Sequence, residues 1–358
     1  MSSSFCEIVP NLGSAHINCV VDFQVSIRSL AFRITPNMLA TEPITDGLIP
    51  ISMATLSPTS LLGIDIYLRA NAQSPAVLFC LANECPDFDR LLPLVRQGVN
   101  KLFIDSGDRG RYQQYLRENW TELLAEESSP VANRAAIMSE VIRDVLNEEF
   151  SNGDIDSVVA ATQRLGKATC DLFSDQTIVA QQLCNVLHHD YATFTHCTNV
   201  SMYCVLLARE LGFSKSDLRE IAVGGLLHDL GKLQIDERIL TKPGKLDDFE
   251  FREIKKHPGI GFALLVERDD LGFGQLMVTY QHHERIDGSG YPVGCLGDEI
   301  HPWARLCAIV DVYEALTSHR PYRSPMSPKT ALAVLDKGNG TEFDKEMLQC
   351  WRKLINSR

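Results

Sequence analysis

The alternation of hydrophobic and polar positions divides this chain into two parts. Between residues 61 and 126 the spacing of apolar residues predicts a succession of short elements. In order they are strand, strand, helix, strand and helix, over residues 62–68, 76–81, 87–97, 99–104 and 109–126. After residue 130, helical spacing dominates and strand patterns become scarce. We therefore expect an α+β chain, in which a small α/β domain precedes an all-α domain.

The same change of pattern gives the expected domain boundaries. Residues 1–45 stay unassigned, because residues 20–27 alternate like a strand while prolines at 36 and 43 indicate loops. A poorly ordered arm and an added strand are both open for this segment. The small α/β domain shows no chemical motif, so a sensory, regulatory or dimerising role and a purely structural one are both open. We expect a regulatory domain over 46–127, a helical linker over 128–168 and a helical domain over 169–358.

Composition excludes several classes of function. The formal net charge of −12 argues against binding to a nucleic-acid polymer or an anionic membrane surface. No apolar run is long enough to span a bilayer, and Asp22 and Arg28 interrupt the best candidate, residues 17–34. The start of the chain lacks a basic region followed by an apolar run, so we expect a cytoplasmic location. The eleven cysteines, none in CxxC spacing, are then expected as reduced thiols.

Histidines concentrate in the second half, where nine of the ten follow residue 187. An apolar helix that follows the capping-box pattern Ser214-x-x-Asp217 ends in His228-Asp229-Leu230-Gly231-Lys232. A buried carboxylate beside an imidazole is costly without a partner, and a shared metal ion supplies one. Gly231 lets the chain pass close to such a site, and Lys232 faces the same space, where it would neutralise a phosphate.

Further potential ligands lie on other predicted helices. Each is more often an ordinary helical residue when taken singly, although Asp311 in an apolar helix is hard to explain without a partner. They are His196, His257, His282, His283 and Asp311. With His228 and Asp229 they make five histidines and two aspartates, a set suited to two metal ions of the Fe, Mn, Zn or Ni kind.

The stretch from His282 to Pro292 predicts a metal-bearing helix end followed by a rigid loop. Two adjacent histidines are followed by Glu284, Asp287, Gly288, Gly290 and Tyr291. The glycines permit backbone angles that other residues resist, and Pro292 fixes the chain after the turn. This loop contains no obvious base.

These motifs resemble those of the HD-GYP family, a branch of the HD phosphohydrolases. The resemblance covers about residues 170–350 and includes the downstream segments Asp311–Thr317 and Arg320-Pro321-Tyr322-Arg323. It implies an all-helical domain with a metal centre, and a phosphodiesterase that opens cyclic di-GMP, a bacterial second messenger. The ligands it implies are His196, His228, Asp229, His257, His282, His283 and Asp311.

The resemblance also implies roles. Asp229 bridges two ions, Lys232 contacts the scissile phosphate, and Arg320 and Arg323, with Tyr322 between them, hold the other phosphate or a guanine. The Gly288–Pro292 loop shapes the pocket and, in this family, contacts partner proteins such as diguanylate cyclases.

Some family members hold a third ion through a Glu one helical turn before the first histidine. This chain has Ala192 there. We therefore expect two divalent ions, Fe or Mn first with Ni, Mg and Zn as alternatives, and linear pGpG rather than GMP as the main product. Two-metal chemistry predicts in-line attack by a bridging hydroxide while Lys232 stabilises the developing charge.

Two other functions stay open. One is hydrolysis of a related cyclic dinucleotide such as cyclic GMP-AMP. The other is a signalling scaffold that binds cyclic di-GMP or a diguanylate cyclase and has little turnover. Separately, homodimerisation through the linker helices over 128–168 stays open. The intact ligand set argues against the scaffold.

Overall fold

The computed structural model describes residues 47–56, 62–69, 74–86, 88–96, 99, 101–125, 131–174, 193–242, 244–318 and 324–356. The strand pattern at 20–27 and the helices expected directly after residue 175 lie outside these ranges.

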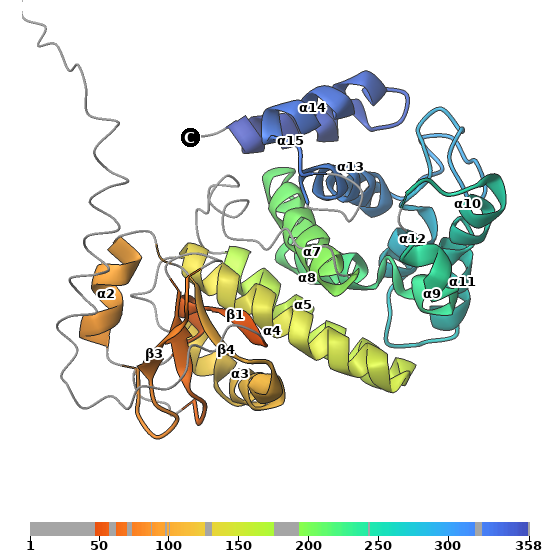
Figure 1. Cartoon of the computed structure of the whole chain (residues 1–358). Helices are drawn as coiled ribbons and strands as arrows, with labels where there is room; N and C mark the ends of the chain where they lie inside the picture. Colours follow the sequence, from red (N-terminus) through yellow and green to blue (C-terminus); the bar gives the residue numbers. More distant parts are fainter. Residues whose placement is uncertain are drawn as a thin grey trace, which may run out of the picture.

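A four-stranded antiparallel sheet forms the N-terminal part (Figure 1). The strands are β1 (Leu48–Ser52), β2 (Ile66–Leu68), β3 (Val77–Cys80) and β4 (Lys101–Asp105), in the order β1-β4-β2-β3. The three predicted strands are present, although β2 is shorter and β4 starts two residues later than expected. β1 was not predicted. Pro50 lies within it, and an edge strand tolerates a proline because one side of its backbone needs no ladder partner.

The other named elements of the described chain are helices and short turns. They are α2 (Phe88–Arg96), α3 (Arg109–Ala125), α4 (Val131–Asn152), α5 (Ile155–Ser174), α7 (Thr193–Glu210), α8 (Lys215–Leu227), α9 (Glu237–Leu240), α10 (Asp248–Ile254), α11 (His257–Leu265), α12 (Phe273–Gln281), α13 (Pro302–Thr317), α14 (Pro328–Leu335) and α15 (Lys345–Asn356), with short 3-10 turns η1 (Met53–Thr55), η2 (Ser106–Asp108), η3 (Leu230–Gln234) and η4 (Asp336–Gly338). The described residues after 131 contain no named strand, as the sequence predicts for this half.

The helices α4 and α5 join the sheet to the helical part, as Figure 1 shows. α4 packs on α3 and η1, while α5 runs along α7 and α8. One cluster of buried apolar side chains is continuous from Ile66 and Ile104 in the sheet, through Ile142 of α4, to Leu226 of α8 and Ile309 of α13. The burial of this cluster holds the two parts together.

Helix ends follow signals present in the sequence. Ser214 caps α8, because its hydroxyl accepts from Asp217 N at 3.1 Å and its own N–H donates to the Asp217 carboxylate at 3.1 Å. This confirms the predicted capping box. Pro258 stands in the first turn of α11, also as predicted. His228 is the C-cap residue of α8 and His282 is that of α12, so two chemical motifs begin at helix C-termini.

Among the described residues, no helix is both long and apolar enough to cross a membrane. Residues 17–34 lie outside them. The eight cysteines that the structure describes are all free thiols.

Candidate metal centre

Asp229 lies at the centre of two groups of potential ligands. Its Oδ1 lies 3.3 Å from His257 Nε2 and 3.9 Å from His282 Nε2. Its Oδ2 lies 3.4 Å from His228 Nε2 and 3.6 Å from His196 Nε2. The two carboxylate oxygens thus face different histidine pairs, which is the arrangement that a bridging carboxylate requires.

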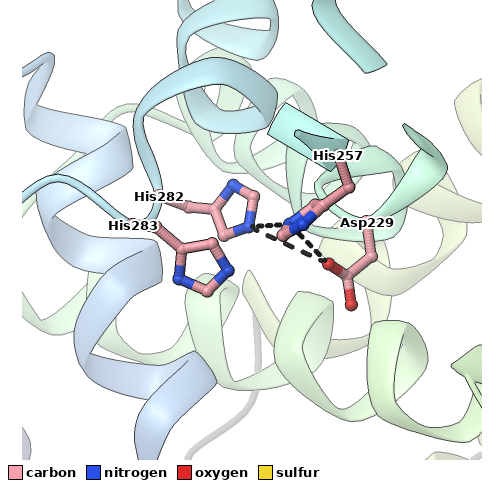
Figure 2. Close-up of side chains that lie close together, drawn as sticks. All are labelled: Asp229, His257, His282 and His283. Atoms are coloured by element: carbon pink, nitrogen blue, oxygen red, sulfur yellow. Dashed lines mark hydrogen bonds and ion pairs between the residues drawn. The ribbon is translucent and has the colours of Figure 1, made fainter. Parts of the chain in front are cut away.

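Each group is completed by one more side chain. Figure 2 shows the His257 and His282 rings directed at the Asp229 carboxylate, with the His283 ring beside that of His282. Donor atoms of Asp229, His257, His282 and His283 lie within 4.8 Å of one another. Donor atoms of His196, His228 and Asp311 satisfy the same limit, and His196 Nε2 lies 3.1 Å from Asp311 Oδ1. The structure therefore brings together all seven predicted ligands.

Backbone carbonyls fix the orientation of three imidazoles. The Nδ1 of His228 donates to Gly225 O at 2.8 Å, that of His257 to Ile254 O at 2.7 Å, and that of His282 to Val278 O at 3.0 Å. A carbonyl accepts only, so in the neutral ring Nε2 carries the lone pair. Such hydrogen bonds commonly orient histidine ligands of metal ions.

Unsatisfied polar atoms show that a metal fits these residues. His228 Nε2 and Asp229 Oδ1 are buried and have no hydrogen-bond partner among the described residues. The Nε2 atoms of His257 and His282 approach to 3.2 Å with lone pairs directed into the same space. Buried polar atoms without partners cost free energy, and lone pairs repel. A cation bound between them would remove both costs.

A buried glutamate orients the first histidine. Glu314 is 2% exposed and lies 2.5 Å from His196 Nδ1 through Oε2. Its Oε1 accepts from Asn199 Nδ2 at 2.9 Å and from the Ser318 hydroxyl. The sequence pattern did not predict a role for Glu314 or Asn199. Their spacing was the available signal. Glu314 lies three residues after Asp311, and Asn199 lies three residues after His196. Residues three apart in a helix share one face, so each lies on the same side as a predicted ligand.

The protonation states suit metal ligands. Burial, reinforced by the neighbouring histidines, holds the pKa of His282 well below its usual value. Burial also lowers the pKa of His283 to about 3, despite the opposing Asp311 carboxylate. Both rings are neutral near pH 7 and therefore able to donate a lone pair.

The acidic ligands remain ionised. Burial favours the neutral acid, but Lys232 and His228 hold the pKa of Asp229 well below its ordinary value. Burial likewise opposes ionisation of Asp311, and the hydrogen bond from His196 lowers its pKa. His196 behaves differently: burial lowers its pKa, yet Glu314 and Asp311 raise it to about 9. In the metal-free chain the His196 ring is therefore protonated near pH 7, and binding of an ion would release that proton.

Lys232 lies at the boundary between the buried ligands and solvent. Its Nζ is 2.5 Å from Asp229 Oδ2 and its side chain is 21% exposed. The predicted proximity of Lys232 to the site is present in the structure. Cys197, which the sequence analysis did not select, is also buried beside His228 and Asp229.

Gly231 allows η3 and the start of α11 to approach closely. A Cβ at this position would lie 2.0 Å from His257 O and 2.6 Å from Gly261 N. Only a residue without a side chain allows this contact. The contact sets Asp229 against His257, two ligands that lie 28 residues apart in the chain.

The loop after His283 is held by a second buried carboxylate. Glu284 is 3% exposed and accepts from Val293 N at 2.7 Å and from Gly294 N. Gly290 passes so close to the backbone of Glu284 that a Cβ would lie 2.5 Å from its Cα. Asp287 accepts from Ser289 N at 3.0 Å, so it stabilises the turn and does not face the ligands.

Tyr291 connects this loop to the centre. Its ring stacks on that of His283 with centroids 4.8 Å apart. Burial, then the Asp311 and Asp229 carboxylates, raise the pKa of Tyr291, so the phenol stays protonated. Pro292 follows it through a cis peptide bond. The loop is therefore a wall of the site, as the sequence predicts.

Four predicted positions lie outside the described residues. They are Ala192, Arg320, Tyr322 and Arg323.

The fold and this ligand set define an HD-type protein, and comparison with known proteins agrees. Residues 174–347 match the HD domain family. The match covers the C-terminal helical part of the chain, and the predicted resemblance to the HD-GYP branch is confirmed.

Several relatives are phosphodiesterases. The chain is 37% identical over 166 residues to a cyclic di-GMP phosphodiesterase of Pseudomonas aeruginosa, covering 46% of this chain and 40% of that protein. It is 40% identical over 173 residues to the cyclic di-GMP phosphodiesterase response regulator RpfG of Xanthomonas campestris, covering 48% and 45%. A 3'3'-cGAMP-specific phosphodiesterase of Vibrio cholerae is 35% identical over 307 residues, covering 79% and 58%. The chain thus spans less than half the length of the first two relatives.

A solved structure shares the fold. Bd1817, an HDG"Y"P protein from Bdellovibrio bacteriovorus, superposes with a TM-score of 0.62 at 18% sequence identity. The match covers 87% of this chain and all of that one. At this identity the likeness concerns the fold alone.

Proposed function

We propose that this chain is a metal-dependent phosphodiesterase that opens cyclic di-GMP to linear pGpG. The single observation that supports it most strongly is Asp229, whose two oxygens face two separate groups of histidines. This arrangement suits two divalent ions, and imidazole with carboxylate favours Fe or Mn, with Ni, Zn and Mg as alternatives. The relatives that act on cyclic dinucleotides supply the substrate class.

The seven ligands would divide between two ions. His257, His282 and His283 would hold one, His196, His228 and Asp311 the other, and Asp229 both. Bound ions would supply an activated water and positive charge against the phosphate oxygens. The protein's part is to keep the ligand lone pairs directed inward, as the backbone carbonyls and Glu314 do.

Lys232 is the proposed partner of the substrate phosphate. It is the cation that lies beside Asp229 and reaches solvent. An ammonium placed there stabilises negative charge as it develops on the phosphate. Arg320, Tyr322 and Arg323 are proposed to bind the second phosphate or a guanine. Diguanylate cyclase docking on the Gly288–Pro292 loop and homodimerisation through the 128–168 helices stay predictions.

A second candidate substrate is cyclic GMP-AMP. The relative that aligns over 79% of this chain is specific for 3'3'-cGAMP, and its alignment extends beyond the metal centre. Both substrates carry the same phosphodiester chemistry, so the metal centre by itself does not distinguish them.

A parallel hydrolysis assay tests the proposal. The protein is loaded anaerobically with Fe or Mn, incubated with each cyclic dinucleotide, and the products are separated by chromatography. We expect pGpG from cyclic di-GMP and a lower kcat/KM for 3'3'-cGAMP. The reverse preference would move the assignment to cyclic GMP-AMP. Rapid accumulation of GMP would contradict the two-ion expectation based on Ala192, and no product with any metal would overturn the function.

A further inference from the structure

A basic pocket opens beside the metal centre, on the side of α10 and α11. It has a volume of about 620 Å³, which is within the range of small-molecule sites. Its walls differ in chemistry. Arg252 and Lys255 contribute positive charge, Gly259 and Ile260 give an apolar helix face, and Tyr291 closes one edge.

Two of the three cations that line this pocket have no ion-pair partner in the described part of the chain. Among the described residues, Arg252 and Lys255 form no ion pair, whereas Lys256 pairs with Glu253 at 2.6 Å. Lys255 Nζ lies 4.8 Å from the ring centre of Phe251 and 4.9 Å from that of Tyr291. The two rings hold the ammonium in place without cancelling its charge. In a chain of net charge −12, two such cations in one pocket indicate an anionic ligand.

Tyr291 links this pocket to the metal centre. Lys255 Nζ is 4.9 Å from the centre of the Tyr291 ring, and that ring is 4.8 Å from the ring of His283. The ammonium therefore lies within about 10 Å of a proposed metal ligand. A mononucleotide bound at the metal centre would not use this pocket, but the second half of a dinucleotide would reach it.

We infer that this pocket binds the second nucleotide of a cyclic dinucleotide while the metal centre holds the scissile phosphate, an assignment that rests on the proposed function. Arg252 and Lys255 bind the phosphate that is not cleaved, which leaves contact with a guanine as the role proposed above for Arg320 and Arg323. Ile260 and the exposed backbone of Gly259 form the apolar surface on which its ribose and base lie. Since the Tyr291 ring is covered by His283 and Lys255, its role is to set the spacing between the two sites and not to stack on a base.

Charge-removing variants test the pocket with the full chain. Lys255→Met keeps an unbranched apolar stem between the two rings and removes the charge. We expect KM for cyclic di-GMP to rise about tenfold, as the loss of one charge-assisted hydrogen bond implies, with kcat little changed. Arg252→Met adds to this effect. Lys329→Met, at an exposed position of α14, removes the same charge and serves as the matched control. Lys255→Arg should restore much of the affinity.

A small generic phosphodiester separates the pocket from the metal centre. Bis(p-nitrophenyl) phosphate has no second nucleotide, so the ratio of kcat/KM for cyclic di-GMP to kcat/KM for this small ester should fall about tenfold in Lys255→Met and keep the wild-type value in Lys329→Met. The KM of the wild type for cyclic di-GMP should also rise with salt more steeply than that of the variant.

Three results would count against the inference. An unchanged KM of Lys255→Met and Arg252→Met for cyclic di-GMP would overturn the pocket while leaving the proposed function intact. An equal loss on both substrates would show damage to the metal centre instead of a subsite. A wild-type protein that cleaves bis(p-nitrophenyl) phosphate but no cyclic dinucleotide would overturn both the function and the pocket.

Discussion

Replacing Gly231 with alanine would place a methyl carbon against the backbone of α11. The added Cβ would lie 2.0 Å from His257 O, whereas real Cβ atoms do not approach within 3.0 Å. One of the two segments must therefore move by about 1 Å, and a backbone oxygen cannot rotate away as a side chain can. Overpacking of this kind costs about 1–3 kcal/mol. A displacement of about 1 Å between catalytic groups lowers a rate about 100-fold.

The assay for Gly231→Ala combines thermal unfolding, metal content and hydrolysis of bis(p-nitrophenyl) phosphate. We expect Tm to fall by several degrees, about 2–4 °C per kcal/mol, with a loss of bound Mn and of activity. Gly110→Ala is the control, because a Cβ there meets nothing within 4 Å and the position is helical. If Gly231→Ala binds metal and turns over like the wild type, the contact between η3 and α11 does not position Asp229.

Three further changes address the ligands and their supports. Glu314→Gln should weaken Mn binding about 10–100-fold, because the amide still accepts a hydrogen bond from His196 but lacks the negative charge of the carboxylate. The Kd is measured by calorimetry, and an unchanged Kd would refute this role of Glu314. Asp229→Asn should leave less than one tightly bound ion per chain, measured by elemental analysis, and retention of two ions would exclude the bridging role. Removal of metal with a chelator should lower Tm. Mn at about 100 times its Kd should then raise the free energy of unfolding by about 2.7 kcal/mol. A Tm that does not change with metal would contradict a metal site in the native state.

Local signals in the sequence were sufficient for the helix ends that bear the ligands. The Ser214 capping box, Pro258 and the His282–Pro292 stretch each act within one or two turns of the chain. The helix ends that they form can therefore be predicted from neighbouring residues. α8 begins after Ser214, α11 begins at His257 and α12 ends just before His282, as these signals predict.

The relative positions of residues that are distant in the chain could not be predicted from the sequence. That Asp229 Oδ1 faces His257 while Oδ2 faces His228 depends on how η3 packs on α11. No supporting role was predicted for Glu314 or Glu284, because a carboxylate on a helix or in a loop is ordinary until its burial is known. Strand β1 was missed for a different reason, since Pro50 disfavours a strand unless its position at the sheet edge is known.

The most direct test of the account is to titrate metal-free protein with Mn and measure cyclic di-GMP hydrolysis at each step. We predict that activity requires added metal, reaches its plateau at two equivalents per chain, and is absent from His228→Ala at every step. Hydrolysis by the metal-free chain, or a plateau at one equivalent with His228→Ala as active as the wild type, would contradict the account.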